Sequence, residues 1–293
     1  MPSPLIFDRA LLRRRRARAA ALGAVTFLLD RVAEDMADRL ATVLREFPVA
    51  VDLGTPTDAL RRMLAASGKT KTIIALDHPA DRRPSPWLRV VADEEALPLR
   101  EASVDLIVSG LALQFVNDLP GVLAQIRRAL KPDGLFLAAM IGGDTLTELR
   151  QSFAAAESEV EGGVSPRVAP FVDLRDLGAL LQRVGFALPV TDVDRIVVRY
   201  DNAFALMQDL RRMGATNILN ERRRTPSRRA TFLKMAQIYA ERFSDPDGRI
   251  RATFDVVWLS GWAPHESQQK PLKPGSAKMS LADAVNKARD SKA

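Results

Sequence analysis

The first half of the chain alternates short apolar runs with amphipathic segments. Apolar positions at helical spacing, among them Phe27, Leu28, Val32, Met36 and Leu40, predict one or two helices over residues 8–47. Short apolar runs then predict strands within residues 49–54, 72–77, 88–98, 103–118 and 135–140. Helical patterns separate several of these runs. We therefore predict an α/β fold, a doubly wound and mostly parallel sheet preceded by N-terminal helices.

The second half of the chain is more mixed. Residues 144–185 have a helical apolar face, whereas 193–200 and 252–264 are rich in residues that favour strands. Two helical patterns between these strands predict a helical insertion at about 201–245, before the last strand. We expect an N-terminal helical segment over 1–48, a main domain over 49–264, and a Pro- and Lys-rich tail over 265–293 whose composition favours disorder.

Polar residues stand at the ends of the predicted strands. Asp52, Asp77, Asp93 and Ser109 all fall at or just beyond a strand end. In a doubly wound sheet, ligands bind at the carboxyl ends of the strands, near the point where the strand order reverses. The sequence therefore predicts a ligand site at this edge.

The loop after the first strand reads VDLGTPTDAL, over residues 51–60. Thr55 as the N-cap, Pro56 at the first helical position and Asp58 three residues after the cap predict that a helix begins here. Only Gly54 is present where a glycine-rich loop would carry more glycines. Pro56 lacks an N–H, and Asp58 puts a carboxylate near a helix start that otherwise favours an anion, so we expect weakened binding of an anionic group.

The composition excludes several kinds of chemistry. The chain has no cysteine, which excludes disulfides, thiolate nucleophiles, iron–sulfur ligation and sulfur-ligated zinc. Its two histidines, His78 and His265, exclude a three-histidine metal site. We expect no metal site.

Basic residues exceed acidic ones, 43 against 36, and many are clustered. The runs are Arg13 to Arg16, and Arg222 to Arg224 with Arg228 and Arg229. Such runs attract nucleic acid, anionic lipid or an acidic protein surface, and a solvated helix surface is the alternative. An aromatic fraction of 6% disfavours nucleic acid, because base stacking needs aromatic side chains.

Several phrases of the sequence resemble a known family. The order of VDLG, TIIALD, ADEEALPL and LKPDGLFLAAM resembles the class I S-adenosylmethionine-dependent methyltransferases, which have a Rossmann-like fold. FDRALLRRR, GGDTLTELRQSF, GGVSPRVAPF and GWAPHESQQKP are similar to phrases of one subfamily, the mitochondrial complex I assembly factor of methyltransferase fold and its alphaproteobacterial relatives. The resemblance extends from Phe7 to about Ser276. A more distant resemblance is to the carrier-protein malonyl O-methyltransferase of biotin synthesis.

The resemblance implies a function and a set of cofactor contacts. The assembly factor acts on an arginine of a quinone-site subunit of NADH:ubiquinone oxidoreductase, and hydroxylates it. By position, the residues implied to contact S-adenosylmethionine are Asp52, Gly54, Asp77, Asp93, Glu94, Ser109 and Gly110. Of these, Asp77 would accept hydrogen bonds from the ribose hydroxyls, and Asp93 with Glu94 would approach the adenine. The residues alone leave alternatives open: a solvated acid at a strand end, a polar turn, and a glycine that only makes a tight turn.

Three further candidates lie late in the chain. Trp262, His265 and Glu266 follow the last strand, which in this fold can return near the substrate mouth, and His265 is a candidate base. A surface histidine at the start of a tail is the alternative. The basic stretch 221–229 is either part of a lid over the site or a solvated helix end.

Three hypotheses follow. The first is an arginine-modifying assembly factor of complex I with a protein client, the second a carrier-protein or small-molecule O-methyltransferase, and the third a scaffold that has lost catalysis. No apolar run is long enough for a membrane span, and no secretory signal is evident at the start. We expect a bacterial cytoplasmic protein, with contact to the inner membrane surface through the arginine runs, or a matrix protein in a mitochondrion.

Overall fold

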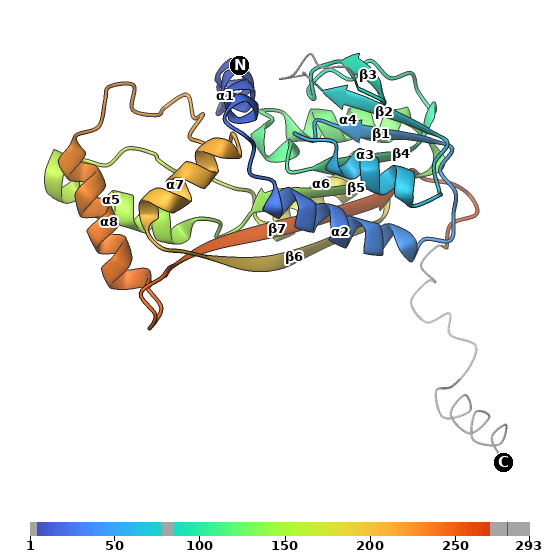
Figure 1. Cartoon of the computed structure of the whole chain (residues 1–293). Helices are drawn as coiled ribbons and strands as arrows, with labels where there is room; N and C mark the ends of the chain where they lie inside the picture. Colours follow the sequence, from blue (N-terminus) through green and yellow to red (C-terminus); the bar gives the residue numbers. More distant parts are fainter. Residues whose placement is uncertain (1–4, 78–84, 270–279, 281–293) are drawn as a thin grey trace.

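A single seven-stranded sheet organises the chain, in a computed structural model that describes residues 5–77, 85–269 and 280 (Figure 1). The strand order is β3-β2-β1-β4-β5-β7-β6. The strands are β1 (Val49–Leu53), β2 (Thr72–Asp77), β3 (Leu88–Val91), β4 (Val104–Gly110), β5 (Leu130–Gly142), β6 (Ala187–Tyr200) and β7 (Ile250–Trp262). Strands β1 to β5 pair in parallel, whereas β7 is antiparallel to both β5 and β6. The predicted doubly wound, mostly parallel sheet is confirmed.

Helices cover both faces of the sheet. They are α1 (Arg9–Ala21), α2 (Phe27–Ala41), α3 (Ala59–Ala66), α4 (Leu119–Ala129), α5 (Thr147–Glu161), α6 (Leu174–Val184), α7 (Ala203–Arg212) and α8 (Arg229–Phe243), with a short 3₁₀ helix η1 at Leu113–Phe115. One face buries its apolar side chains against α2 and α3, and the other against α4 and α6. Figure 1 shows α5, α7 and α8 grouped beyond the sheet, next to one end of β6 and β7.

Successive side chains of β1 point to opposite faces of the sheet, so the strand contributes to the apolar cores on both sides. Ala50 belongs to the core on the α3 side, while Val51 and Leu53 belong to the core on the α4 side. Asp52 therefore points toward α3, because successive side chains of a strand face opposite ways. The strand order reverses between β1 and β4, so the carboxyl ends of these two strands form the switch point at which doubly wound sheets bind ligands.

Some predicted element boundaries are corrected. Helix α3 begins at Ala59, with Asp58 as its N-cap, rather than beside Thr55, because Gly54 takes a left-handed backbone with φ of 70° and the next four residues are not helical. Residues 144–185 form two helices separated by residues 162–173, not one helical run. The third strand ends at Val91 and is followed by the acidic turn, as the sequence predicted.

The N-terminal residues form two helices at different places. Helix α2 lies on the sheet with an apolar face, whereas α1 buries only Leu12 and Ala19. Phe7 and Leu12 pack with Ile218 and Leu219, so α1 is joined to the connection after α7. Among the described residues, no helix has the length and apolar composition that a membrane span requires. His78 and most of the expected tail lie outside the described residues.

Candidate functional site

A cavity of about 1020 Å³ lies along the carboxyl edge of the sheet. Its wall includes Gly54 after β1, Asp77 at the end of β2, Leu111 after β4 and Ile141 in β5, so it extends across the switch point. Side chains of α5 and α7 close the far end. This volume is at the upper end of the range for small-molecule sites. The prediction of a ligand site at this edge is therefore matched by a cavity there.

Asp77 is a predicted site residue that lies in the cavity wall. Its Oδ2 is 3.5 Å from Nη1 of Arg61, and its buried Oδ1, which lies 3.9 Å from Nε of Arg89, accepts no hydrogen bond from any described residue. A buried acceptor without a partner is costly, and a ligand hydroxyl that donates to it would remove that cost. The residue therefore fits the role of holding the ribose of a nucleoside cofactor.

Asp52 lies behind the loop and not in the cavity wall. Its Oδ2 accepts a hydrogen bond of 2.8 Å from Arg61, and its Oδ1 accepts one from the Thr55 hydroxyl. Burial raises the pKa of Asp52 to about 7 in spite of the opposing effects of Arg61 and Thr55. Arg61 thus links two strand-end carboxylates, and its Nη2 also donates to the Thr57 carbonyl oxygen of the loop at 2.7 Å.

Gly54 lines the cavity and also lies next to Glu94 of the acidic turn. A Cβ at this position would lie 2.8 Å from Cγ of Glu94, and the backbone φ of 70° also favours glycine. The loop therefore needs this glycine both for its turn and for the close approach of Glu94. Pro56 and Asp58 also line the cavity, and Asp58 pairs with the exposed Arg62.

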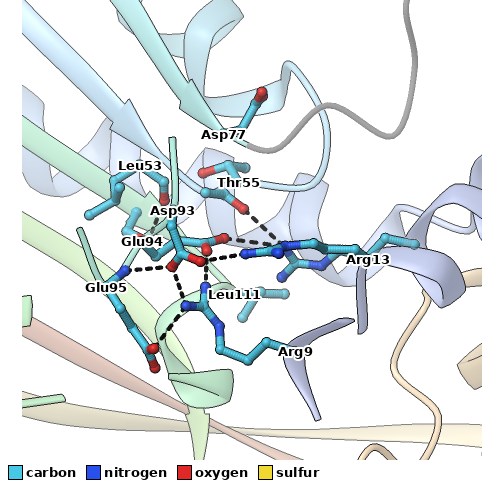
Figure 2. Close-up of polar contacts among 12 residues, drawn as sticks. Arg9, Arg13, Leu53, Thr55, Asp77, Asp93, Glu94, Glu95 and Leu111 are labelled. Carbon is cyan, nitrogen blue, oxygen red and sulfur yellow. Dashed lines mark hydrogen bonds and ion pairs between the residues drawn. The ribbon is translucent and has the colours of Figure 1, made fainter. Parts of the chain in front are cut away.

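Asp93 and Glu94 are bound by arginines of α1 (Figure 2). Arg9 contacts both carboxylates and lies 3.1 Å from Glu95, and Arg13 contacts Asp93. Burial works against ionisation of Asp93, but hydrogen bonds from the Glu95 N–H and Arg9 prevail and the pKa of Asp93 is lowered. These acids do not line the cavity and instead fasten α1 across the sheet edge.

Arg16 is a site residue that the sequence prediction missed. It lies in the cavity wall, with Nη1 3.5 Å from both the Gly54 carbonyl oxygen and Oε1 of Glu94. Burial lowers the pKa of Arg16, with Glu94 partly opposing the shift. Arg9, Arg13 and Arg16 are spaced by four and three residues, which places them on one face of a helix. This spacing could have indicated a shared contact surface, but the sequence analysis considered only the run Arg13 to Arg16 and took a solvated helix surface as the alternative to an external partner.

Ser109 and Gly110 lie within β4 and are buried beneath the cavity wall. The Ser109 hydroxyl donates to the Leu53 carbonyl oxygen at 2.8 Å, and the Gly110 N–H donates to the Thr55 hydroxyl at 3.0 Å. They join β4 to the β1 loop. The wall at this point is formed instead by Leu111 and by Gln114 of η1, neither of which was predicted.

Trp262, His265 and Glu266 lie at the opposite edge of the sheet, which corrects the expectation that they return to the substrate mouth. Trp262 pairs with Leu135 near the start of β5, because β7 runs antiparallel to the parallel strands. It packs against Phe47. His265 is exposed and contacts the Ser267 hydroxyl at 2.7 Å. The cavity and these residues are therefore separated by the length of the sheet.

The basic stretch 221–229 is partly neutralised within the protein. Arg222 lies 3.2 Å from a carboxylate oxygen of Asp8, and both Arg223 and Arg228 lie within ion-pair distance of Glu161. None of these arginines lines the cavity. Within the part of the chain that the structure describes, no group of three or more potential metal ligands comes together.

Comparison with known proteins identifies the class. A family model described as a methyltransferase domain matches residues 51–138. The YcgJ protein of Bacillus subtilis has a similar crystal structure, with a TM-score of 0.52 at 15% identity over 80% of this chain and 99% of that one. The fold is that of the class I methyltransferases, as the sequence predicted.

Full-length relatives identify the family. The mitochondrial arginine-hydroxylase NDUFAF5 of Danio rerio is 40% identical over 286 residues, which cover 95% of this chain and 89% of the relative. The chain belongs to the family of this protein. The malonyl-[acyl-carrier protein] O-methyltransferase of Xylella fastidiosa is 37% identical over 225 residues, 74% of each chain.

Proposed function

We propose that the protein binds S-adenosylmethionine in the cavity and modifies an arginine side chain of a protein client, a subunit of respiratory complex I. The observation that carries this proposal is the cavity itself, whose wall includes Gly54 of the loop, the Asp77 carboxylate and apolar side chains of α5 and α7. The name of the zebrafish relative, an arginine-hydroxylase, and the resemblance in the subfamily phrases support an arginine as the substrate.

The residues present fit the parts of the cofactor. Asp77 would accept hydrogen bonds from the ribose hydroxyls, and Gly54 lets the backbone approach the methionine part. Arg16 would pair with the cofactor carboxylate, since its present contacts of 3.5 Å are long for a guanidinium. Asp93 and Glu94 would act through α1, which they hold over the site, more than through contact with adenine. When bound, the cofactor supplies an electrophilic methyl group.

Two outcomes for the arginine are chemically distinct. Methylation transfers the methyl group to a guanidinium nitrogen, which loses a proton. Hydroxylation replaces a C–H or N–H hydrogen by a hydroxyl group, and it balances with molecular oxygen and a two-electron reductant, the second oxygen atom leaving as water. We favour hydroxylation because of the name of the relatives at about 40% identity. We place the reaction in the bacterial cytoplasm, or the mitochondrial matrix, at the membrane surface where the client resides.

The carrier-protein methyltransferase is the second candidate, supported by the Xylella relative. An acidic carrier protein requires free basic residues around the mouth. Arg222, Arg223 and Arg228 are instead paired with Asp8 and Glu161, and they lie outside the cavity wall. This placement favours the arginine-modifying function.

Calorimetric titration with S-adenosylmethionine and S-adenosylhomocysteine tests the cofactor part. We expect Asp77→Ala to weaken binding about tenfold to a hundredfold, because hydrogen bonds to a charged group are lost. Asp58→Ala is the matched control in the same wall, and we expect it to bind equally or more tightly, since it removes a carboxylate near the helix start. No binding by the wild-type protein at millimolar cofactor would refute the proposal and favour a scaffold.

Deleting the gene in its host tests the reaction. Mass spectrometry of the quinone-site subunits then shows whether an arginine loses the mass of one oxygen atom or of one methylene group. An unchanged arginine in the deletion strain would contradict the proposed function, whatever the calorimetry gives.

A further inference from the structure

Arg61 is a buried arginine in the first turn of α3. It is the third residue of the helix, which begins at Ala59, and it is 3% exposed. A positive charge in the first turn opposes the helix dipole, and a buried charge is unfavourable unless it is paired and hydrogen-bonded. An arginine at this place is therefore stable only if its contacts compensate for both effects.

The guanidinium of Arg61 joins groups from three different segments. Its Nη1 donates to Oδ2 of Asp52 in β1 at 2.8 Å and lies 3.5 Å from Oδ2 of Asp77 at the end of β2. Its Nη2 donates to the Thr57 carbonyl oxygen in the loop before α3 at 2.7 Å. Because the guanidinium is planar and rigid, these contacts fix its orientation relative to both strands.

The two carboxylates that share Arg61 are not equivalent. Asp52 is fully buried, and both of its oxygens are used within the protein, by Arg61 and by the Thr55 hydroxyl. Asp77 lines the cavity, and its Oδ1 accepts no hydrogen bond from any described residue. Arg89 is a second cation near Asp77, but its Nε is 3.9 Å from Oδ1. Arg61 therefore makes the shorter of these two contacts and limits how the Asp77 carboxylate can turn.

The loop in front of Arg61 is bound from behind. A glycine-rich loop at a helix start holds its ligand through backbone N–H groups, and Pro56 has none to offer. The Thr55 hydroxyl donates to Asp52, and the Thr57 carbonyl oxygen accepts from the guanidinium. The loop thus directs polar groups toward the buried cluster, and the cluster in turn reaches the cavity through the Asp77 carboxylate.

We infer that Arg61 is a positioning residue for the cofactor, because it holds the Asp77 carboxylate in the orientation that recognises the ribose hydroxyls. This inference deepens the proposed function and rests on it. Without any ligand, Arg61 would still neutralise the buried Asp52, which is a purely structural role. The two roles can be separated, since only the positioning role makes recognition of the ribose hydroxyls depend on Arg61.

Ribose discrimination measures the positioning role. The probes are S-adenosylhomocysteine and its 2′,3′-dideoxy counterpart, each titrated by calorimetry, and the measured quantity is the ratio of their two dissociation constants. Loss of hydrogen bonds to a carboxylate weakens binding about tenfold to a hundredfold, so the wild-type protein should prefer the ribose form by that factor. Without Arg61, the Asp77 side chain must be ordered on binding, which should lower the ratio about twofold to tenfold.

The variants are chosen so that the fold survives. Removing Arg61 alone would leave Asp52 buried without its cation, so we compare Asp52→Asn with the double variant Asp52→Asn and Arg61→Leu, in which neutral groups replace the buried pair. Arg61→Lys keeps the charge but cannot hold both carboxylates in one planar fork. Arg62→Leu is the matched control, because Arg62 is in the same helix, is 60% exposed and pairs with Asp58.

The expected ratios differ between the two roles. We expect the ratio to fall about twofold to tenfold from Asp52→Asn to the double variant and from the wild type to Arg61→Lys, and to stay unchanged in Arg62→Leu. Equal ratios in Asp52→Asn and the double variant overturn the inference, and so does a wild-type ratio in Arg61→Lys. Circular dichroism shows whether each protein is folded. If the double variant is unfolded, Arg61→Lys alone decides.

Failure of the proposed function gives a different result. A wild-type protein that binds neither probe at millimolar concentration refutes cofactor binding and the inference with it. A wild-type protein that binds both probes equally leaves cofactor binding intact but overturns the inference, because Asp77 then recognises no ribose hydroxyl. The mass of the client arginine in the deletion strain tests the reaction itself and does not depend on Arg61.

Discussion

Replacing Arg9 by alanine tests whether α1 is fastened to the sheet edge by buried charges. The Arg9 side chain is 11% exposed and its partner Glu94 is 7% exposed, so their ion pair is largely shielded from water. Arg13, one turn further along the same helix, is 36% exposed, and its ion pair is with Asp93, which is itself 33% exposed. The two arginines are therefore a matched pair that differ in burial.

The difference in burial sets the expected loss of unfolding free energy for each substitution. Removing one partner of a buried ion pair costs about 3–5 kcal/mol, and here Arg13 and Arg16 remain near the acids, so we expect about 2–3 kcal/mol for Arg9→Ala. For a chain of this size that lowers Tm by about 5–10 °C. Arg13→Ala should cost less than about 1 kcal/mol, as for other exposed pairs.

Urea unfolding followed by circular dichroism measures both free energies of unfolding. Limited trypsin digestion shows, in addition, whether α1 detaches by itself, since a helix that buries few apolar residues can open locally. The Arg9 effect should persist in ~0.5 M salt, because shielded pairs are screened less than exposed ones. Equal destabilisation by the two substitutions, or an Arg9 effect that salt abolishes, would refute the reasoning.

Two further predictions concern Asp52 in β1 and Gly54 directly after it. Gly54→Ala should destabilise the fold by about 2–3 kcal/mol and weaken cofactor binding, because a Cβ there meets Glu94 at 2.8 Å on a left-handed backbone. Gly68→Ala is the control for calorimetry and unfolding alike, with φ of 67° and open space around it, and should cost only about 1 kcal/mol. Burial raises the pKa of Asp52 to about 7, above its value in the unfolded chain, so its contribution to stability is complete below about pH 4 and is lost as the pH rises through 7. Asp52→Asn cannot titrate, and urea unfolding at a series of pH values should show a flatter dependence of the unfolding free energy on pH between about pH 4 and 7; an unchanged slope would place the titration elsewhere.

The strands of the sheet could be predicted from the sequence because each is encoded by a short, continuous run of apolar residues. Runs such as residues 49–54 and 72–77 are apolar over the length of a buried strand, and the position of Asp77 at a strand end fixes its edge of the sheet. The cavity at the switch point follows from topology alone. Asp77 and Gly54 were found in this way, and both line the cavity.

The remaining parts of the site depend on contacts between distant segments. The arginines of α1 find their partners about 80 residues later, at Asp93 and Glu94, and no local pattern records which acid an arginine meets. Trp262 was misplaced because the direction of β7 is a property of the whole sheet. Gln114 was not predicted because a single glutamine in an apolar stretch gives no local indication that it lines a cavity.

The cavity draws its two ends from different parts of the chain, and this has a consequence for how the family diversifies. The loop end comes from β1 and β2, within or near the stretch that matches the general methyltransferase domain, whereas the apolar end comes from α5, α7 and the connections beside them. Mutations that reshape the second group leave the first untouched. The chain is 40% identical to a protein named an arginine-hydroxylase and 37% identical to one named a carrier-protein methyltransferase, and substitutions confined to the second group would change the substrate end of the cavity while leaving the loop end as it is.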